Sequence, residues 1–152
     1  MFNIQKAGLN ELEPLAELFD QYRVFYQKSS DREGAKKFLG ERISNNDSKI
    51  FVCMDEAGEL RGFVQLYPLF SSTRMKKLWL LNDLFVAERF RGRGYSVALI
   101  DRAKELCIST GACGLMLETA KDNIIGNELY PKTGFVLEEH SNFYNWSPET
   151  WG

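Results

Sequence analysis

The sequence has 152 residues, which is enough for one domain with a sizeable core and short for two, so we expect a single domain over residues 1–152. With 44% hydrophobic and 26% charged residues, its composition is that of an ordinary globular protein. The formal net charge of -2 gives no overall basic field, which argues against nucleic acid or an anionic membrane as a partner.

The first half of the chain is predicted to form a short strand, two helices and three strands. Residues 2–5 are the candidate opening strand. Apolar residues recur three or four positions apart between Leu12 and Gln27, which predicts a helix. Ser30 and Glu33 have the spacing of a capping box, so a second helix is expected from there to Ile43. Three further apolar segments predict strands, with a loop after the second of them: residues 50–54, 60–67 and 77–86, with the loop at 68–75.

The second half begins with a basic, glycine-bearing stretch and continues with helices and strands. Apolar residues at helical spacing follow it, and Gly111 is a suitable C-terminal cap for that helix. The later elements are expected as a strand at 113–119, a short helix at 124–130 and closing strands at 135–138 and 142–146. Hairpins imply antiparallel pairing, and helical crossovers after Val86 and Thr119 imply parallel pairing. We therefore expect an α/β (α+β) fold in which helices cover both faces of a mixed sheet.

Cysteine and histidine usage argues against metal and disulfide chemistry. Cys53, Cys107 and Cys113 are odd in number and form no CxxC pair, so they are interpreted as reduced thiols. His140 is the sole histidine, and we expect no metal site. The amino terminus lacks the layout of a signal peptide and no apolar run has the ~20 residues of a membrane span, so we expect a cytoplasmic protein.

A phosphate-binding turn is predicted between the strand that ends at Val86 and the helix that carries Leu99. Its residues are Arg91, Gly92, Arg93, Gly94, Tyr95 and Ser96. Glycines allow positive φ angles and close approach of the backbone to a ligand, and the free N–H groups at a helix start attract anions. Arg89, Arg91 and Arg93 add positive charge that suits a pyrophosphate or a 3′-phosphate.

The alternative interpretation of this turn is a solvated basic loop, which the residues Arg-Gly-Arg-Gly alone would favour. Two other phosphate motifs are excluded. The Walker A motif needs Gly-Lys followed by Ser or Thr, which does not occur in the sequence. In a dinucleotide-binding GxGxxG motif the third glycine would stand where Val97 lies.

Residues 80–99 resemble motif A of the GCN5-related N-acetyltransferases (GNAT), in which Gln or Arg is followed by two residues, Gly, one residue and Gly or Ala. Arg91 and Gly94 match this pattern, and Ser96 departs from it conservatively. Residues 123–130 with Gly134 and Phe135 are similar to motif B of the same family. The resemblance covers nearly the whole chain. It implies a mostly antiparallel central sheet of six to seven strands flanked by helices, with a splayed parallel strand pair at the cofactor site.

The same resemblance implies acetyl-CoA as the co-substrate, without a metal. Backbone groups of Leu84, Phe85 and Val86 would bind the pantetheine arm and the thioester carbonyl, and Asn123 would bind the arm near its end. Asn is also a favoured N-cap, so Asn123 has a second expected role at the start of its helix. Tyr130 matches the family tyrosine that protonates the departing thiolate, with a packed aromatic residue as the alternative. Pro131 would end or kink the helix there.

Asp83 is the candidate group for the acceptor amine. An alkyl amine is protonated at neutral pH and must lose a proton before it attacks a thioester, and Asp83 would accept that proton or attract the cation. A strand-end aspartate bonded to nearby backbone is the alternative. The Asn82-Asp83-Leu84 strand and the tyrosine-bearing first helix are similar to the polyamine and histone acetyltransferase subgroup, except that Asn82 stands where that subgroup has Glu.

Two functions remain open at this point. The first is N-acetyl transfer from acetyl-CoA to a small or peptide amine by direct attack in a ternary complex. The second is a non-catalytic acyl-CoA sensor, which Asn82 and Pro131 keep open. A homodimer through the aromatic closing segment is a further expectation, based on Phe143, Tyr144, Trp146 and Trp151.

Overall fold

The computed structural model describes residues 2–149, and the chain divides after Glu118 into two compact units. In the first unit, a sheet of five strands has the order β1-β2-β3-β4-β5. The strands are β1 (Asn3–Lys6), β2 (Lys49–Met54), β3 (Leu60–Ser71), β4 (Lys76–Val86) and β5 (Leu115–Met116). Neighbours are antiparallel except β4 and β5, which are parallel. The expected mixed sheet with one parallel pair is therefore confirmed.

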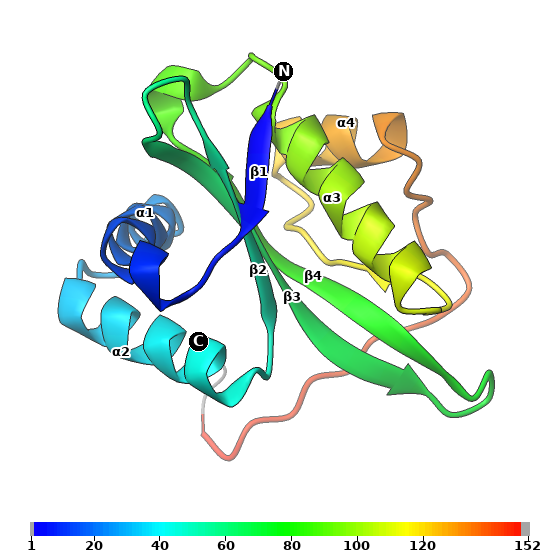
Figure 1. Ribbon diagram of the computed structural model, residues 1–152. Coiled ribbons are helices and arrows are strands. Elements are labelled where there is room, and N and C mark those ends of the chain that lie inside the picture. The colour runs from blue at the N-terminus through cyan, green and yellow to red at the C-terminus, as the bar shows by residue number, and fades with distance from the viewer. Residues whose placement is uncertain (1, 150–152) are drawn as a thin grey trace. The chain divides into compact units, whose positions relative to one another are not determined.

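The helices of the first unit cover both faces of this sheet. They are α1 (Leu12–Phe25), α2 (Arg32–Asn45) and α3 (Tyr95–Ser109), with short 3-10 turns η1 (Leu9–Glu11) and η2 (Glu88–Phe90). Figure 1 shows α1 and α2 together on one face and α3 on the other. The second unit contains α4 (Ile124–Lys132).

The start of α2 differs from the expected capping box by one residue. Asp31 is the N-cap, and its carboxylate accepts the N–H of Gly34 at 2.9 Å. Ser30 instead donates its hydroxyl to Asp20 of α1 at 2.6 Å, which ties the two helices together at this end. Aspartate is at least as good a cap as serine, so the helix begins where Asp31 can close the turn.

The β3–β4 hairpin is longer than predicted, because the strand continues through Pro68 to Ser71. Pro68 pairs in register with Trp79, whose N–H donates away from β3 to Gly114 at 3.1 Å. On the other side of β3, the partner strand β2 begins only at Lys49, opposite Leu66. The missing N–H of Pro68 therefore breaks no ladder bond, and the strand tolerates it.

The prediction of six to seven strands is wrong for the described residues. The expected closing strands at 135–138 and 142–146 have no regular secondary structure and pair with no strand of residues 2–149. Their apolar side chains are exposed, for example 91% for Val136 and 89% for Tyr144. Strand propensity produces a strand only where a partner supplies backbone hydrogen bonds, and the pattern here lacks one.

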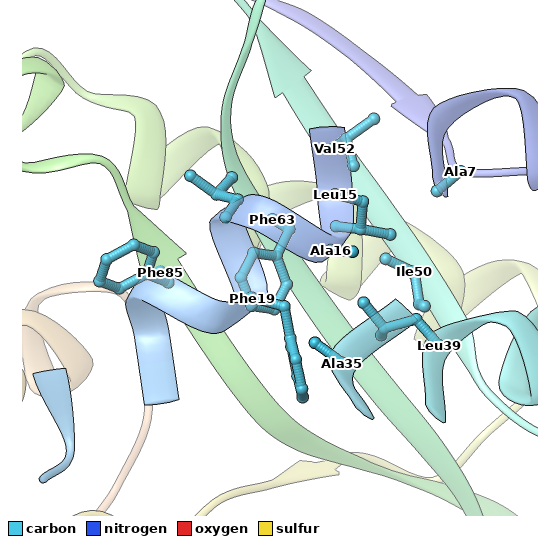
Figure 2. Close-up of a cluster of buried hydrophobic side chains, with 11 residues drawn as sticks. Ala7, Leu15, Ala16, Phe19, Ala35, Leu39, Ile50, Val52, Phe63 and Phe85 are labelled. Carbon is cyan, nitrogen blue, oxygen red and sulfur yellow. The ribbon is translucent and has the colours of Figure 1, made fainter. Parts of the chain in front are cut away.

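The core of the first unit lies between α1, α2 and one face of the sheet (Figure 2). It contains Leu15, Ala16, Leu18 and Phe19 of α1, Ala35 and Leu39 of α2, and Ile50, Val52, Phe63 and Phe85 of the sheet. Burying a side chain such as Leu39 or Phe63 contributes roughly 1.5–3 kcal/mol. Alternate strand residues point to the opposite face, where Arg102 of α3 lies over the ring of Phe51 at 4.3 Å. The sheet is thus anchored on both faces around β4.

Candidate active site

Asp83 is buried on β4, and side chains from α1, β3 and β4 hold its carboxylate. Tyr22 of α1 donates its hydroxyl to Oδ1 at 2.8 Å, and Gln65 of β3 donates Nε2 to Oδ2 at 2.8 Å. The adjacent Asn82 donates Nδ2 to Oδ1 at 3.1 Å. These partners are side chains, so Asp83 does not have the backbone-bonded arrangement of the alternative interpretation. The carboxylate is fixed in orientation and faces the α1 side of the sheet.

A β-bulge at Asn82 gives Asp83 this direction. Gln65 pairs with Asp83, but the next residue of β3, Leu66, pairs with Leu81, which leaves Asn82 as the extra residue. Before the bulge, Trp79 faces α3 and donates its indole N–H to Thr110 at 2.9 Å. Without the extra residue, Asp83 would point to the same face as Trp79, because side chains four residues apart in a regular strand lie on one face. The bulge therefore places the carboxylate on the α1 side.

Beside Asp83, one edge of β4 pairs with no strand of residues 2–149, and this is the open edge of β4. β5 pairs with β4 only at Trp79 and Leu80, so the splayed parallel pair is present. Ala87 donates its N–H to the Arg61 carbonyl of β3 at 2.7 Å. The backbone N–H and C=O groups of successive residues in a strand point alternately to its two edges. Phe85 then faces β3, whereas the backbone groups of Leu84 and Val86 face the open edge. The Val86 carbonyl accepts from Arg91, so the backbone groups of Leu84 and the N–H of Val86 are the ones that can pair with an extended ligand that contains amides.

The predicted phosphate-binding turn follows this edge directly. Gly92 and Gly94 have φ angles of +75° and +89°, in the left-handed region that favours glycine. Gly94 is the N-cap of α3 and no side chain caps this helix start. The N–H groups of the first turn, which includes Tyr95 and Ser96, are thus directed out of the helix end. This is the local geometry that binds anionic oxygens.

The arginines of the turn have different surroundings. Arg91 donates Nε to the Val86 carbonyl at 2.9 Å, and its guanidinium lies 5.1 Å from the ring centre of Phe25 and 5.2 Å from that of Phe85. It links the turn to β4 and α1. Arg93 lies over the ring of Phe90 at 5.0 Å. Both arginines are exposed, but Arg91 is bonded to the Val86 carbonyl, so Arg93 is the better placed of the two to meet an anion from solvent.

In the second unit, α4 has well-defined ends. Asn123 is its N-cap, with Oδ1 accepting the N–H of Gly126 at 3.1 Å and Nδ2 donating to Thr119 at 2.8 Å. The expected capping role is confirmed. At the other end, Phe135 donates its N–H to the Tyr130 carbonyl at 3.0 Å, and Gly134 has φ +96°. These features form a Schellman motif, which fixes the end of the helix.

Pro131 lies inside α4, and the helix continues to Lys132. The expected end at Tyr130 is therefore wrong by two residues. Pro131 has no N–H to donate to the carbonyl four residues earlier, whereas its own carbonyl accepts the N–H of Gly134 at 3.2 Å. The ring of Tyr130 packs edge-on against Phe135, with centroids 5.7 Å apart. The motif that ends the helix thus also holds the tyrosine ring.

The structure brings Asp83, the open edge and the turn together in the first unit, and Asn123 and Tyr130 in the second. Sequence reasoning missed Gln65 and Ser48. Gln65 is fully buried, and its Oε1 accepts the Ser48 hydroxyl at 2.9 Å. A lone amide inside the apolar run of β3 was the available signal for Gln65, whereas Ser48 carried none.

A tyrosine of β3, Tyr67, stands two residues after Gln65 and shares its face of the sheet. Burial, and then the negative charge of Asp83, raise the pKa of Tyr67 to about 12. The phenol is therefore protonated throughout the physiological range and adds no second charge beside Asp83.

Among residues 2–149, no group of three or more His, Cys, Asp or Glu side chains is placed to hold a metal ion. In the same part of the chain, no helix has the length and apolarity needed to cross a membrane.

The model of the acetyltransferase (GNAT) family matches residues 13–135, which is most of the chain. The chain belongs to this family. It is 40% identical over 144 residues to an uncharacterized N-acetyltransferase, YhfO, of Bacillus subtilis, and the match covers 95% of each protein. A crystal structure of a probable acetyltransferase superposes with a TM-score of 0.92 at 36% identity, covering 97% of this chain and 98% of that one.

The GNAT fold is also shared with the aminoglycoside acetyltransferase AAC(6')-Iy. That structure, in complex with a bisubstrate analogue of CoA and acetylneamine, has a TM-score of 0.80 at 20% identity and covers 97% of this chain and 99% of that one. The present chain is an acetyl-CoA-dependent N-acetyltransferase. Its residues fit that co-substrate: the uncapped start of α3 suits the pyrophosphate, and the open edge of β4 suits the amides of the pantetheine arm.

Proposed function

We propose that this GNAT protein transfers the acetyl group of acetyl-CoA to a primary amine by direct attack in a ternary complex. The observation that carries the proposal is the buried carboxylate of Asp83 beside the open edge of β4. The carboxylate can bind an incoming ammonium and the open edge can bind the acetyl donor, at neighbouring positions of one strand. The bisubstrate analogue bound by AAC(6')-Iy supports this scheme, because it joins both substrates in one molecule.

On the donor side, the turn formed by Arg91, Gly92, Arg93, Gly94, Tyr95 and Ser96 binds the pyrophosphate. Backbone N–H groups of Leu84 and Val86 bind the arm and polarise the acetyl carbonyl. Asn123 adds a bond near the end of the arm, beyond its capping role. Residues 1–152 are proposed to form one N-acetyltransferase domain.

On the acceptor side, Asp83 binds the ammonium or accepts its proton, and Tyr130 protonates the leaving thiolate. The acceptor is a small or polyamine-like primary amine, or a lysine or amino terminus of a protein, in line with the resemblance to the polyamine and histone acetyltransferase subgroup. Nucleic acid and membranes are not partners, and the site of action is the cytoplasm. No residue of the chain needs to become acetylated.

A homodimer is proposed through the closing segment. Phe143, Tyr144 and Trp146 are exposed in the described chain, and Trp151 of the same expected surface lies outside the described residues. Exposed aromatic side chains of this density are typical of an interaction surface. Light scattering after gel filtration is expected to give twice the monomer mass, and a monomer at all concentrations would contradict the dimer.

Calorimetric titration with acetyl-CoA tests the donor part of the proposal, with NADH and ATP as controls. We expect acetyl-CoA alone to bind, followed by thiol release when an amine is added. Absence of acetyl-CoA binding would refute the assignment of the turn. Binding without thiol release for any amine would instead favour a non-catalytic acyl-CoA sensor.

A further inference from the structure

Gln65 is held in one orientation in the middle of β3. Its side chain is fully buried, and both ends of the amide are bonded. A carboxylate only accepts hydrogen bonds, so the end that faces Asp83 must be Nε2. Oε1 then faces Ser48, whose hydroxyl must donate. The arrangement Ser48–Gln65–Asp83 therefore has a fixed direction.

This arrangement leaves Asp83 with unequal oxygens. Oδ1 accepts from Tyr22 and Asn82, whereas Oδ2 accepts from Gln65. A carboxylate offers about four acceptor positions, two on each oxygen. Among residues 2–149, these three bonds leave one acceptor position, which is on Oδ2, next to the Gln65 amide. A further donor that approaches Asp83 is directed to that side.

The surroundings of this position select the kind of donor. The ring of Tyr22 packs within 5.8 Å of the rings of both Phe63 and Phe85, so the Asp83 carboxylate lies among aromatic groups. In such surroundings a charge-assisted hydrogen bond is stronger than a neutral one. A protonated alkyl amine meets both conditions, since its ammonium neutralises Asp83 and its carbon chain contacts the rings. An aryl amine, uncharged at neutral pH, offers only the weaker bond.

We propose that Gln65, locked by Ser48, is a positioning residue that directs Oδ2 of Asp83 to the acceptor, and that the site thereby selects alkylammonium over arylamine acceptors. This inference rests on the proposed function and adds the class of acceptor and two residues that hold its anchor. Tyr22 positions Oδ1 in the same way.

Exchange of the two side-chain types tests the role of the position of the charge. In the variant Gln65→Glu/Asp83→Asn, the amide of position 83 can donate to the carboxylate of position 65, Ser48 can still donate to position 65, and Tyr22 to position 83. The net charge and the hydrogen bonds are kept, but the carboxylate moves from β4 to β3. The single variants Gln65→Glu and Asp83→Asn serve as matched controls.

We expect Gln65→Glu to lower the thermal midpoint, because two carboxylates then face each other. The double variant should recover most of the lost thermal stability. Its KM for n-butylamine, spermidine or a lysine peptide should nevertheless stay at least about tenfold above that of the unmodified protein. The dissociation constant of acetyl-CoA should not change. Ser48→Ala should raise the same KM by a smaller factor, with kcat unchanged.

The inference is overturned if the double variant restores KM together with the midpoint, because the position of the charge would then be irrelevant. It is also overturned if aniline is acetylated as efficiently as the alkyl amines. Protein that binds acetyl-CoA but releases no thiol with any alkyl amine would refute the acceptor class and leave the donor site standing. Failure to bind acetyl-CoA would refute the proposed function itself.

Discussion

Gly94→Ala is the most informative single change at the proposed donor site. Gly94 has φ +89°, and an L-residue in the left-handed region is strained by roughly 1–2 kcal/mol. A Cβ at this position would also lie 2.9 Å from Cζ of Phe2, a half-exposed ring that can rotate away. The turn of the free variant should therefore relax to relieve the strain, and binding must restore the left-handed geometry.

The restored strain should appear as lost affinity. Because about 1.4 kcal/mol corresponds to a tenfold change, we expect acetyl-CoA to bind Gly94→Ala roughly five- to thirtyfold more weakly by calorimetry. Gly92 has φ +75°, and no atom lies within 4 Å of a Cβ added there. Gly92→Ala should therefore lose affinity through backbone strain alone, without a contact to Phe2. Gly111→Ala, at φ +67° after the end of α3, also has open space around it.

Gly111→Ala is the matched control, because it introduces the same backbone strain away from the turn. It should lower the thermal midpoint and leave the dissociation constant of acetyl-CoA unchanged. Wild-type affinity in both Gly92→Ala and Gly94→Ala would refute the reasoning, since the left-handed turn would then play no part in binding. Equal losses in all three variants would point to general destabilisation instead.

Three further predictions concern the leaving group, packing and pH. Tyr130→Phe should lower turnover with no change in acetyl-CoA affinity, and unchanged turnover across pH would remove this tyrosine from the mechanism. Gly62→Ala places a Cβ 2.8 Å from Sγ of Cys53 and 2.9 Å from the Phe85 carbonyl, so it should lose roughly 1–3 kcal/mol in a urea titration. An unaltered urea midpoint would show that β3 and β4 adjust freely there. Burial raises the pKa of Cys53 from 9.0 to about 12. The folded pKa exceeds the unfolded one, so this contribution is complete below pH 9 and falls above it by about 1.4 kcal/mol per unit. Cys53→Ala should show a smaller loss of stability between pH 8 and 10.5, and an identical loss would contradict the assignment.

The elements around the donor site could be predicted from the sequence because local rules decide them. The apolar spacing of α1 and the glycines of the turn act over a few residues, and the structure places both as expected. Asn123 caps α4 for the same reason. These features depend on side chains that interact with backbone three or four positions away, so one sequence is enough to find them.

The acceptor side could not be predicted to the same depth, because it depends on contacts between distant parts of the chain. Tyr22 and Gln65 reach Asp83, and Ser48 reaches Gln65, only after α1 and the strands have assembled. The bulge at Asn82 likewise depends on pairing with β3, and the residues of β4 alone do not predict it. For the closing segment the prediction was wrong in the opposite way. Its residues favour a strand, but a strand forms only where a neighbouring strand pairs with it.

The extra residue in β4 divides the strand into two parts that evolution can change separately. Before Asn82, Trp79 and Leu80 pair with both β3 and β5, and Trp79 also bonds to Thr110 at the end of α3, so substitutions there affect three strands and a helix. Residues after it carry the Asp83 carboxylate and the open edge, and the alternation of faces starts anew at the bulge. On the proposed function, acceptor preference can therefore change through residues 83–86 together with their partners on α1 and β3, without a change in the part of β4 that pairs with β5.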